Sequence, residues 1–286
     1  MLSIKQKAYK FWTYIILTLP LSIWGQNMVS IGYGTTLYKG DLSLPGFFED
    51  FKNAGQAFQI QYKAPLNKQM KLRLGFMAGQ IKGDDAGAST LAQRQRNLKF
   101  FSSIKEGQLA LEYTFSDRFM RNSPLSLYAV GGLVYFSFDP QTNYNGIERK
   151  LAPLKTENQT VAYKTKDFAL QMGGGIQLEL NEAIALNFEL VGRLTNTDYL
   201  DDVSGGYPDY NLVLDSQGPI TAALSDRRDE FFNLPEGTTD APGIGTNGTR
   251  GNPNSKDYYI TGILSIIIHL NPDFNSGTKG ILCPKL

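Results

Sequence analysis

The residues that could do chemistry are few in this chain, and their spacing fits no catalytic site. Its 286 residues include one histidine, His269, and one cysteine, Cys283. A nucleophile–base pair would have to use His269, and no G-x-S-x-G sequence is present. Zinc clusters of Cys and His are excluded by the same counts. We therefore predict no enzyme and no cofactor; the alternative, a lipid hydrolase, would need a serine or aspartate close to His269.

Acidic residues gather in one long polar segment, residues 195–257. Asp198, Tyr199, Asp201 and Asp202 open it, and further aspartates follow. Such oxygens could surround Ca²⁺, but their spacing is not that of an EF-hand loop. The pattern predicts a solvated acidic loop without a bound metal.

Cys283 lies in a C-terminal segment that has no strand pattern. In an oxidising compartment, a lone cysteine is either a free thiol or the partner in an intermolecular disulfide. We hypothesise a disulfide or close contact with a periplasmic partner.

The elements that position these residues are long alternating segments. Apolar residues take every second place in 168–180 and again in 184–194, with three turn-like residues between. Each half has the length of a transmembrane barrel strand and exceeds an ordinary soluble strand. The pair predicts a hairpin with one face toward lipid and one toward a polar interior.

Six further segments have the pattern of strands, although 98–115 alternates clearly only in its second half and 125–138 is apolar on both faces. Long and short connections alternate between the strands. This pattern predicts an all-β fold, an eight-stranded antiparallel transmembrane β-barrel with short periplasmic turns and long external loops. The alternative is a soluble sandwich or lipocalin-like barrel. The expected strands are 29–38, 56–63, 70–80, 98–115, 125–138, 168–180, 184–194 and 258–270.

The ends of the chain fit that architecture. Residues 1–25 have the basic, apolar and small-residue regions of a signal peptide. The barrel would occupy 26–270, including the external loop 195–257, and 271–286 would be a periplasmic tail. The expected location is the outer membrane of a Gram-negative bacterium, with both termini periplasmic. A net charge of +1 gives no electrostatic case for nucleic acid.

Charged residues on the polar faces should point into the barrel. Eight strands leave room inside only for side chains, so opposite charges there should pair across the lumen. We predict a plugged lumen, with a narrow polar pore as the alternative. The expected polar network consists of Arg73, Glu112, Glu179, Glu189 and Arg193.

Six short stretches resemble one family, the Bacteroidetes outer-membrane β-barrel proteins typified by PorG, of the type IX secretion and gliding machinery. The stretch Thr197-Asp198-Tyr199-Leu200-Asp201-Asp202-Val203-Ser204-Gly205 carries most of the resemblance. The last strand departs from the barrel pattern because it lacks a terminal aromatic residue. The other stretches are 96–100, 151–154, 224–227, 257–259 and 283–285.

The resemblance implies a non-enzymatic barrel that anchors or organises a periplasmic secretion or gliding complex. Its partners would be outer-membrane lipid, a periplasmic ring lipoprotein and that lipoprotein's partner protein. The alternative is a barrel whose long external loops bind an extracellular ligand or surface. We predict that the tail and basic short turns make the contacts, namely Cys283, Pro284, Lys285, Asn67, Lys68, Arg118 and Arg121.

Overall fold

A computed structural model describes residues 27–44, 49–115, 123–238 and 249–270 of the chain. The expected signal peptide and C-terminal tail lie outside these ranges. Among the described residues, every helix is too short or too polar to cross a membrane.

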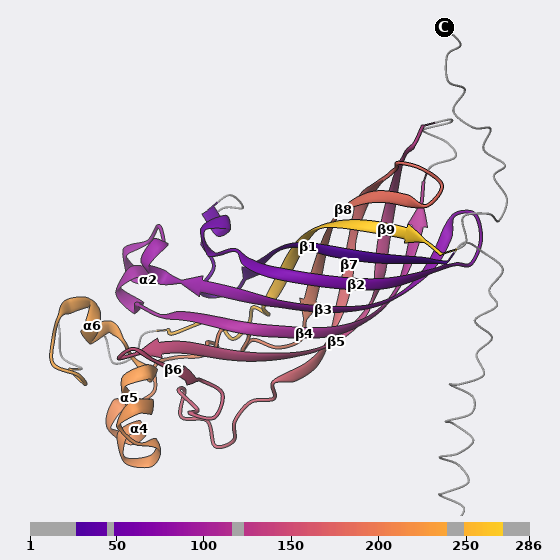
Figure 1. Ribbon diagram of the computed structural model, residues 1–286. Coiled ribbons are helices and arrows are strands. Elements are labelled where there is room, and N and C mark those ends of the chain that lie inside the picture. Colours follow the sequence, from indigo (N-terminus) through magenta and orange to yellow (C-terminus); the bar gives the residue numbers. More distant parts are fainter. Residues whose placement is uncertain (1–26, 45–48, 116–122, 239–248, 271–286) are drawn as a thin grey trace, which may run out of the picture.

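Eight strands close into an antiparallel β-barrel, which confirms the predicted fold class (Figure 1). Neighbours along the chain pair with one another, and β4 pairs with β5 while β1 pairs with β9 to complete the ring. A ninth strand, β6, only extends one edge beyond the barrel. The strands are β1 Met28–Lys39, β2 Gly55–Pro65, β3 Met70–Asp84, β4 Lys99–Thr114, β5 Leu125–Tyr144, β6 Ile147–Lys150, β7 Lys166–Glu179, β8 Ile184–Thr195 and β9 Tyr258–His269.

The β7–β8 hairpin shows how local sequence sets the register. Asn181 accepts hydrogen bonds through its side chain from the amides of Ala183 and Ile184, which closes the tight turn. Leu178 then faces Leu186, and Ile176 faces Phe188. Because side chains alternate between faces along each strand, the apolar set shares one side.

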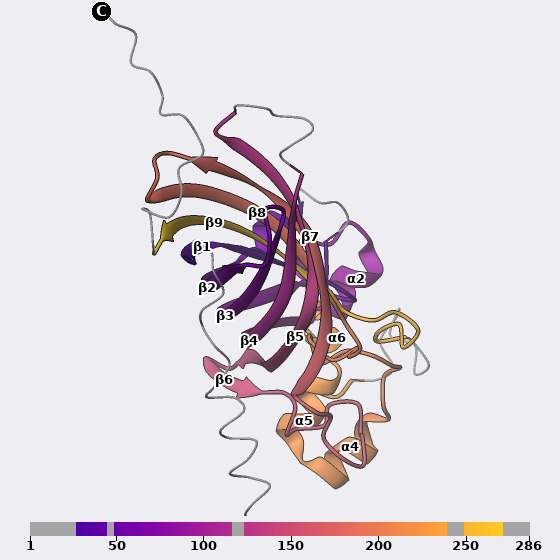
Figure 2. The ribbon, with the colours of Figure 1, turned by 90° about the vertical axis from the view of Figure 1, so that its right-hand side faces the viewer.

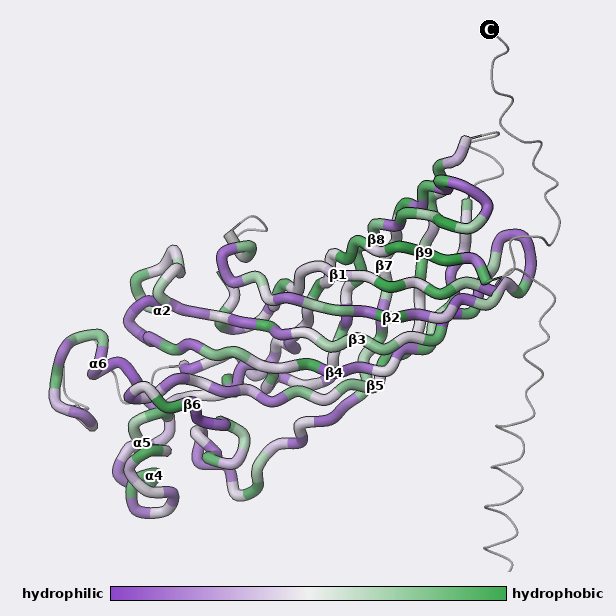
Figure 3. Tube along the Cα trace, in the orientation of Figure 1, coloured by the Kyte–Doolittle hydropathy of each residue, from purple (hydrophilic) through white to green (hydrophobic). Residues whose placement is uncertain are grey.

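The apolar face of the barrel points outward. In β8, the exposed fractions of Phe188 and Leu190 are 45% and 46%, whereas Glu189 and Val191 are almost fully buried. Leucine, isoleucine and aromatic side chains are exposed in the same way on the other strands, most densely on β8 and β9 (Figure 3). A contiguous exposed belt of this kind is the surface that a barrel presents to lipid.

The strands are strongly staggered around the ring. Following paired residues once around from Met28 leads back to Tyr38, ten residues further along the same strand. Such an offset tilts every strand relative to the barrel axis and gives an interior that side chains can fill.

The two ends of the barrel differ. One, the short-turn end, carries the β2–β3 and β7–β8 turns, and there the amide of Leu270 donates to the carbonyl of Asn27. The other, the loop end, carries the helices that the described residues form (Figures 1 and 2). They are η1 Glu49–Asn53, η2 Asp85–Gly87, α2 Leu91–Arg96, α4 Tyr210–Gln217, α5 Pro219–Ser225 and α6 Arg228–Phe232.

The alternation in the sequence says nothing about the internal structure of the loop end, and the described residues there form helices. The long connection after β8 folds into α4, α5 and α6, and Asp209 caps α4 by accepting from the amides of Asn211 and Leu212. Strand β5 runs to Tyr144 and turns back through Asn145 and Gly146, whose φ angles are 51° and 77°. These left-handed angles suit an Asn-Gly hairpin turn, which sequence reading had placed inside a loop.

Candidate functional site: the lumen and the two barrel ends

A buried carboxylate, Glu112, organises the lumen near the short-turn end. Its oxygens lie 3.0 Å from Lys63 Nζ, 2.7 Å from Lys71 Nζ and 3.5 Å from an Arg73 nitrogen. The side chains of Lys63 and Glu112 are fully buried. Strands β2, β3 and β4 bring these four side chains together because each lies on the inward face of its strand.

The network continues across the barrel. Arg73 Nη2 lies 2.7 Å from Glu189 Oε2, and the Tyr128 hydroxyl donates to the same carboxylate at 2.9 Å. A second pair joins Arg193 to Glu106 at 2.9 Å. Gln59 links the two halves, since its amide nitrogen lies within hydrogen-bond distance of both Glu189 and Gln108. Charged groups from opposite walls therefore neutralise one another, as a dry interior requires.

Sequence reasoning missed several members of this network, including Lys63 and Glu106. Lys63 sits at the end of the polar face of β2, and Glu106 lies in the first half of β4, where the alternation in the sequence is unclear. The β4 register is continuous from Lys99 to Thr114, so Glu106 points inward. The Tyr259 hydroxyl donates to it at 2.5 Å.

Toward the loop end, the lumen changes from polar to apolar. Met77, Ile81, Ile104, Phe136 and Ile263 are fully buried there. The same cluster includes Phe100 of β4, Leu224 of α5 and the loop residues Leu42, Leu98, Leu151, Leu200 and Val203. The interior is therefore filled by a salt-bridged layer and then by a hydrophobic layer that continues into the loops.

Two buried aspartates meet above this hydrophobic layer. The Tyr38 hydroxyl lies 2.6 Å from Asp201 Oδ2 and 3.0 Å from Asp257 Oδ1. Burial raises the pKa of Asp201 to about 8 and that of Asp257 well above its ordinary value. A desolvated carboxyl holds its proton more tightly, so burial favours the protonated form of both aspartates.

A second cluster surrounds Asp202. Thr156 and Tyr163 donate to its two oxygens at 2.5 and 2.6 Å, and Arg250 Nη2 lies 3.5 Å away. Arg250 also pairs with Glu157 at 3.0 Å. Burial raises the pKa of Asp202 to about 6.

The prediction of a solvated acidic loop was wrong for the aspartates that open the segment, whereas Asp209 and Asp215 further along are exposed. Asp198, Asp201 and Asp202 are buried, and the Ser204 hydroxyl donates to Asp198 at 2.6 Å. The half-buried Tyr199 stacks on Tyr163, with ring centres 4.5 Å apart. The segment is thus a packed cap that ties the connection after β8 to the loop before β7. Across the described ranges, His, Cys, Asp and Glu side chains form no group of three suited to a metal ion.

At the short-turn end, Asn67 and Lys68 are exposed in the β2–β3 turn, where Asn67 accepts from the amides of Gln69 and Met70. Glu179 belongs to the lumen rim, with its side chain 39% exposed and 3.3 Å from His269 Nε2. Arg118, Arg121, Cys283, Pro284 and Lys285 lie outside the described residues.

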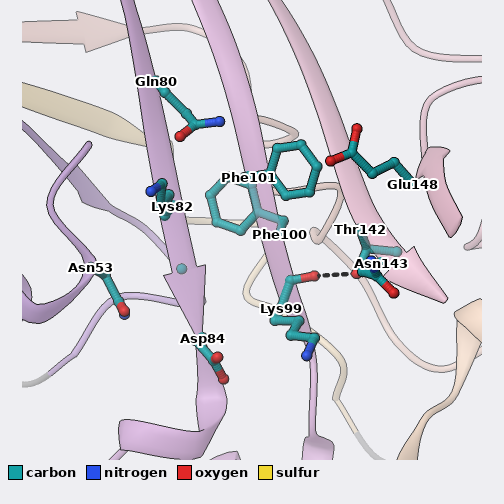
Figure 4. Close-up of a pocket in the computed structure, with 11 residues that line it drawn as sticks. Asn53, Gln80, Lys82, Asp84, Lys99, Phe100, Phe101, Thr142, Asn143 and Glu148 are labelled. Carbon is teal, nitrogen blue, oxygen red and sulfur yellow. Dashed lines mark hydrogen bonds between the residues drawn. The ribbon is translucent and has the colours of Figure 1, made fainter. Parts of the chain in front are cut away.

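The outer wall of the barrel carries a groove at the loop end, of about 360 Å³. Residues from β3, β4, β5 and β6 line it, and the Thr142 hydroxyl donates to the Lys99 carbonyl at its edge (Figure 4). Lys82, Lys99 and Phe101 belong to this lining, with Asp84 and Glu148.

Comparison with known proteins identifies a family. The family described as "Domain of unknown function (DUF6089)" matches residues 9–215. The search of curated proteins found no match.

Three solved structures have a similar fold. Neisserial surface protein A (NspA) shares 8% identity, with 85% of this chain and 96% of that chain covered and a TM-score of 0.43. Ail of Yersinia pestis, solved with the heparin analogue sucrose octasulfate, shares 11%, with 85% and 97% covered and a TM-score of 0.39. The outer membrane protein OprG from Pseudomonas aeruginosa shares 10%, with 85% and 95% covered and a TM-score of 0.39.

Proposed function

Because the chain belongs to the DUF6089 family and folds as a closed eight-stranded barrel, we propose that it is a non-enzymatic anchor in an outer membrane. One observation carries this proposal: the outward face is apolar and exposed, whereas the lumen is filled by Glu112 and its partners and by the hydrophobic layer above them. A barrel of this kind offers protein partners outside the bilayer its two ends. The charged groups of the lumen near the short-turn end pair with one another, Lys63, Lys71 and Arg73 with Glu112 and Glu189, and Arg193 with Glu106.

The protein complex that it anchors attaches at the short-turn end. That end faces the periplasm in our proposal, and it carries the exposed Asn67–Lys68 turn and both ends of the described barrel, Asn27 and Leu270. Arg118 and Arg121 in the β4–β5 connection add positive charge, which suits an acidic partner face. The tail residues Cys283, Pro284 and Lys285 follow β9 and would complete the contact.

The identity of the anchored complex is inferred from the sequence resemblance and not from the fold. We propose a periplasmic ring of the type IX secretion or gliding machinery, built from a lipoprotein and its partner protein. Cys283 would form a close contact or a disulfide with one of them.

Deleting residues 272–286 tests the proposal. The partner should be lost from a pull-down, while the barrel still migrates as a compact species on unheated gels. Replacing the deleted residues with a Gly/Ser segment of equal length controls for chain length.

Charge-reversal variants distinguish partner binding at the short-turn end from binding at the loop end. Lys68→Glu should weaken co-purification, whereas Lys256→Glu, at an exposed position of the loop end, should not. Unchanged co-purification after tail deletion would defeat the proposal. Loss only with loop-end variants would favour binding outside the cell.

A further inference from the structure

The outward face of the barrel changes from apolar to basic between two neighbouring rows of residues. On the paired strands β4, β5 and β7, one row consists of Gly107, Tyr135 and Phe168. The next row toward the loop end consists of Lys105, Ser137 and Lys166. The Tyr135 and Phe168 rings lie 5.0 Å apart and are about half exposed, as aromatic residues at a membrane interface are.

The two lysines of this row have no anionic partner. Both are exposed, and neither forms an ion pair with any residue that the structure describes. One row further out, Asp139 is already engaged, because Lys150 Nζ and Gln141 Nε2 each lie 2.8 Å from its Oδ2. The charge of Lys105 and Lys166 is therefore uncompensated at the edge of the apolar belt.

The spacing of the row fits a single phosphate. Lys105 and Lys166 sit on strands that flank β5, so their backbones lie roughly 10 Å apart. Long flexible side chains from both can converge on a group above Ser137, whose half-buried hydroxyl lies between them.

Space for the rest of the ligand exists on both sides of the row. A side chain placed on Gly107 would meet no heavy atom within 4 Å, so the lipid face is notched beside Tyr135. Toward the loop end, the groove of Figure 4 adds Lys82 and Lys99 around Phe101. An acyl chain can therefore leave in one direction while a polar headgroup extends in the other.

We propose that Lys105, Ser137 and Lys166 bind the phosphate of an anionic lipid in the leaflet on the loop side of the membrane. This inference rests on the proposed function only in requiring that the barrel is embedded in lipid. The row adjoins the lipid-facing belt directly, which makes a membrane lipid the occupant instead of a soluble anion. Lysines near an anionic membrane surface each strengthen binding severalfold.

Native mass spectrometry of the detergent-solubilised full chain, titrated with diphosphoryl lipid A, tests this site. The double variant Lys105→Gln/Lys166→Gln should bind about thirtyfold more weakly than wild type. The variant Lys105→Arg/Lys166→Arg should retain binding, since the charge is kept. The matched control, Arg94→Gln/Lys256→Gln, removes two exposed charges elsewhere on the loop end and should bind as wild type does.

Two further titrations distinguish a lipid phosphate from free phosphate. Dephosphorylated lipid A should bind wild type as weakly as lipid A binds the double Gln variant, and inorganic phosphate should compete only at far higher concentration. Equal binding of lipid A to wild type and to a compactly folded double Gln variant would overturn the inference, as would phosphate binding as tightly as lipid A. A wild-type chain that stays soluble without detergent would overturn the proposed function instead.

Discussion

At the scale of single residues, the lumen is organised by charge neutralisation. Glu112 accepts from Lys63 and Lys71 and lies close to Arg73; Lys63, Arg73 and Glu112 are buried, and the Lys71 side chain is 16% exposed. A buried ion pair adds little net stability when intact, but removing one partner leaves the other charge stranded. The stability of the barrel should therefore be most sensitive to substitution of Glu112, which has the most charged partners.

Glu112→Gln should destabilise the barrel. The substitution keeps the shape but removes the charge opposite three cations, so the free energy of unfolding should fall by roughly 3–5 kcal/mol. Urea unfolding in detergent micelles, followed by circular dichroism, measures the change. The control is Glu182→Gln in the exposed β7–β8 turn, which should unfold as wild type does; an equal effect of both variants would contradict the assignment.

Asp201 should make the loop end less stable as pH rises. Its folded-state pKa of about 8 exceeds the unfolded value of roughly 3.9, so the folded state holds a proton that the unfolded state releases. Stability is then full below about pH 4 and declines as pH rises toward 8. Protease resistance of the loop end should be higher at pH 5 than at pH 8.5.

Asp201→Asn should flatten this pH dependence, because the amide does not ionise. Asp215→Asn, at an exposed position of α4, should keep the wild-type slope. A wild-type slope in Asp201→Asn would assign the effect to another group, such as the neighbouring Asp257.

At the scale of elements, the β7–β8 hairpin should tolerate change at its turn but not on its outward face. Leu190 lies near the middle of the apolar belt and is 46% exposed. Leu190→Arg should reduce stability in lipid bilayers by about 2–4 kcal/mol. Glu182→Arg in the turn should have little effect, and urea titration of protein folded into vesicles compares the two; equal stabilities would argue against lipid contact at Leu190.

The strands could be predicted from sequence, and the loop end could not, for a physical reason. Alternation reports which side of a strand meets lipid, so it located most of the barrel strands and the inward position of Arg193. No such periodicity records that Asp202 packs against Thr156, Tyr163 and Arg250. Those contacts join segments that lie tens of residues apart in the sequence. Without knowledge of these partners, a segment rich in aspartate and glycine is predicted to be solvent-exposed.

At the scale of the whole molecule, the filled lumen predicts the absence of a conductance. The salt-bridged layer and the apolar layer around Phe136 and Ile263 follow one another along the axis. Purified wild-type protein in planar bilayers should show no steady ion current above the lipid baseline. Stable unitary currents that disappear with Phe136→Trp would contradict the filled interior and favour the pore alternative.

The pairing of β1 with β9 imposes an order on assembly. Met28 lies opposite His269, so the seam joins the first strand to the last across nearly the whole sequence. Such long-range pairing is slow to form, and until it does, two strand edges stay open to unwanted partners. During biogenesis, the nearly complete sheet must therefore be protected from other chains until β9 pairs with β1. Any truncation within β9 should leave the protein as an open, aggregation-prone intermediate.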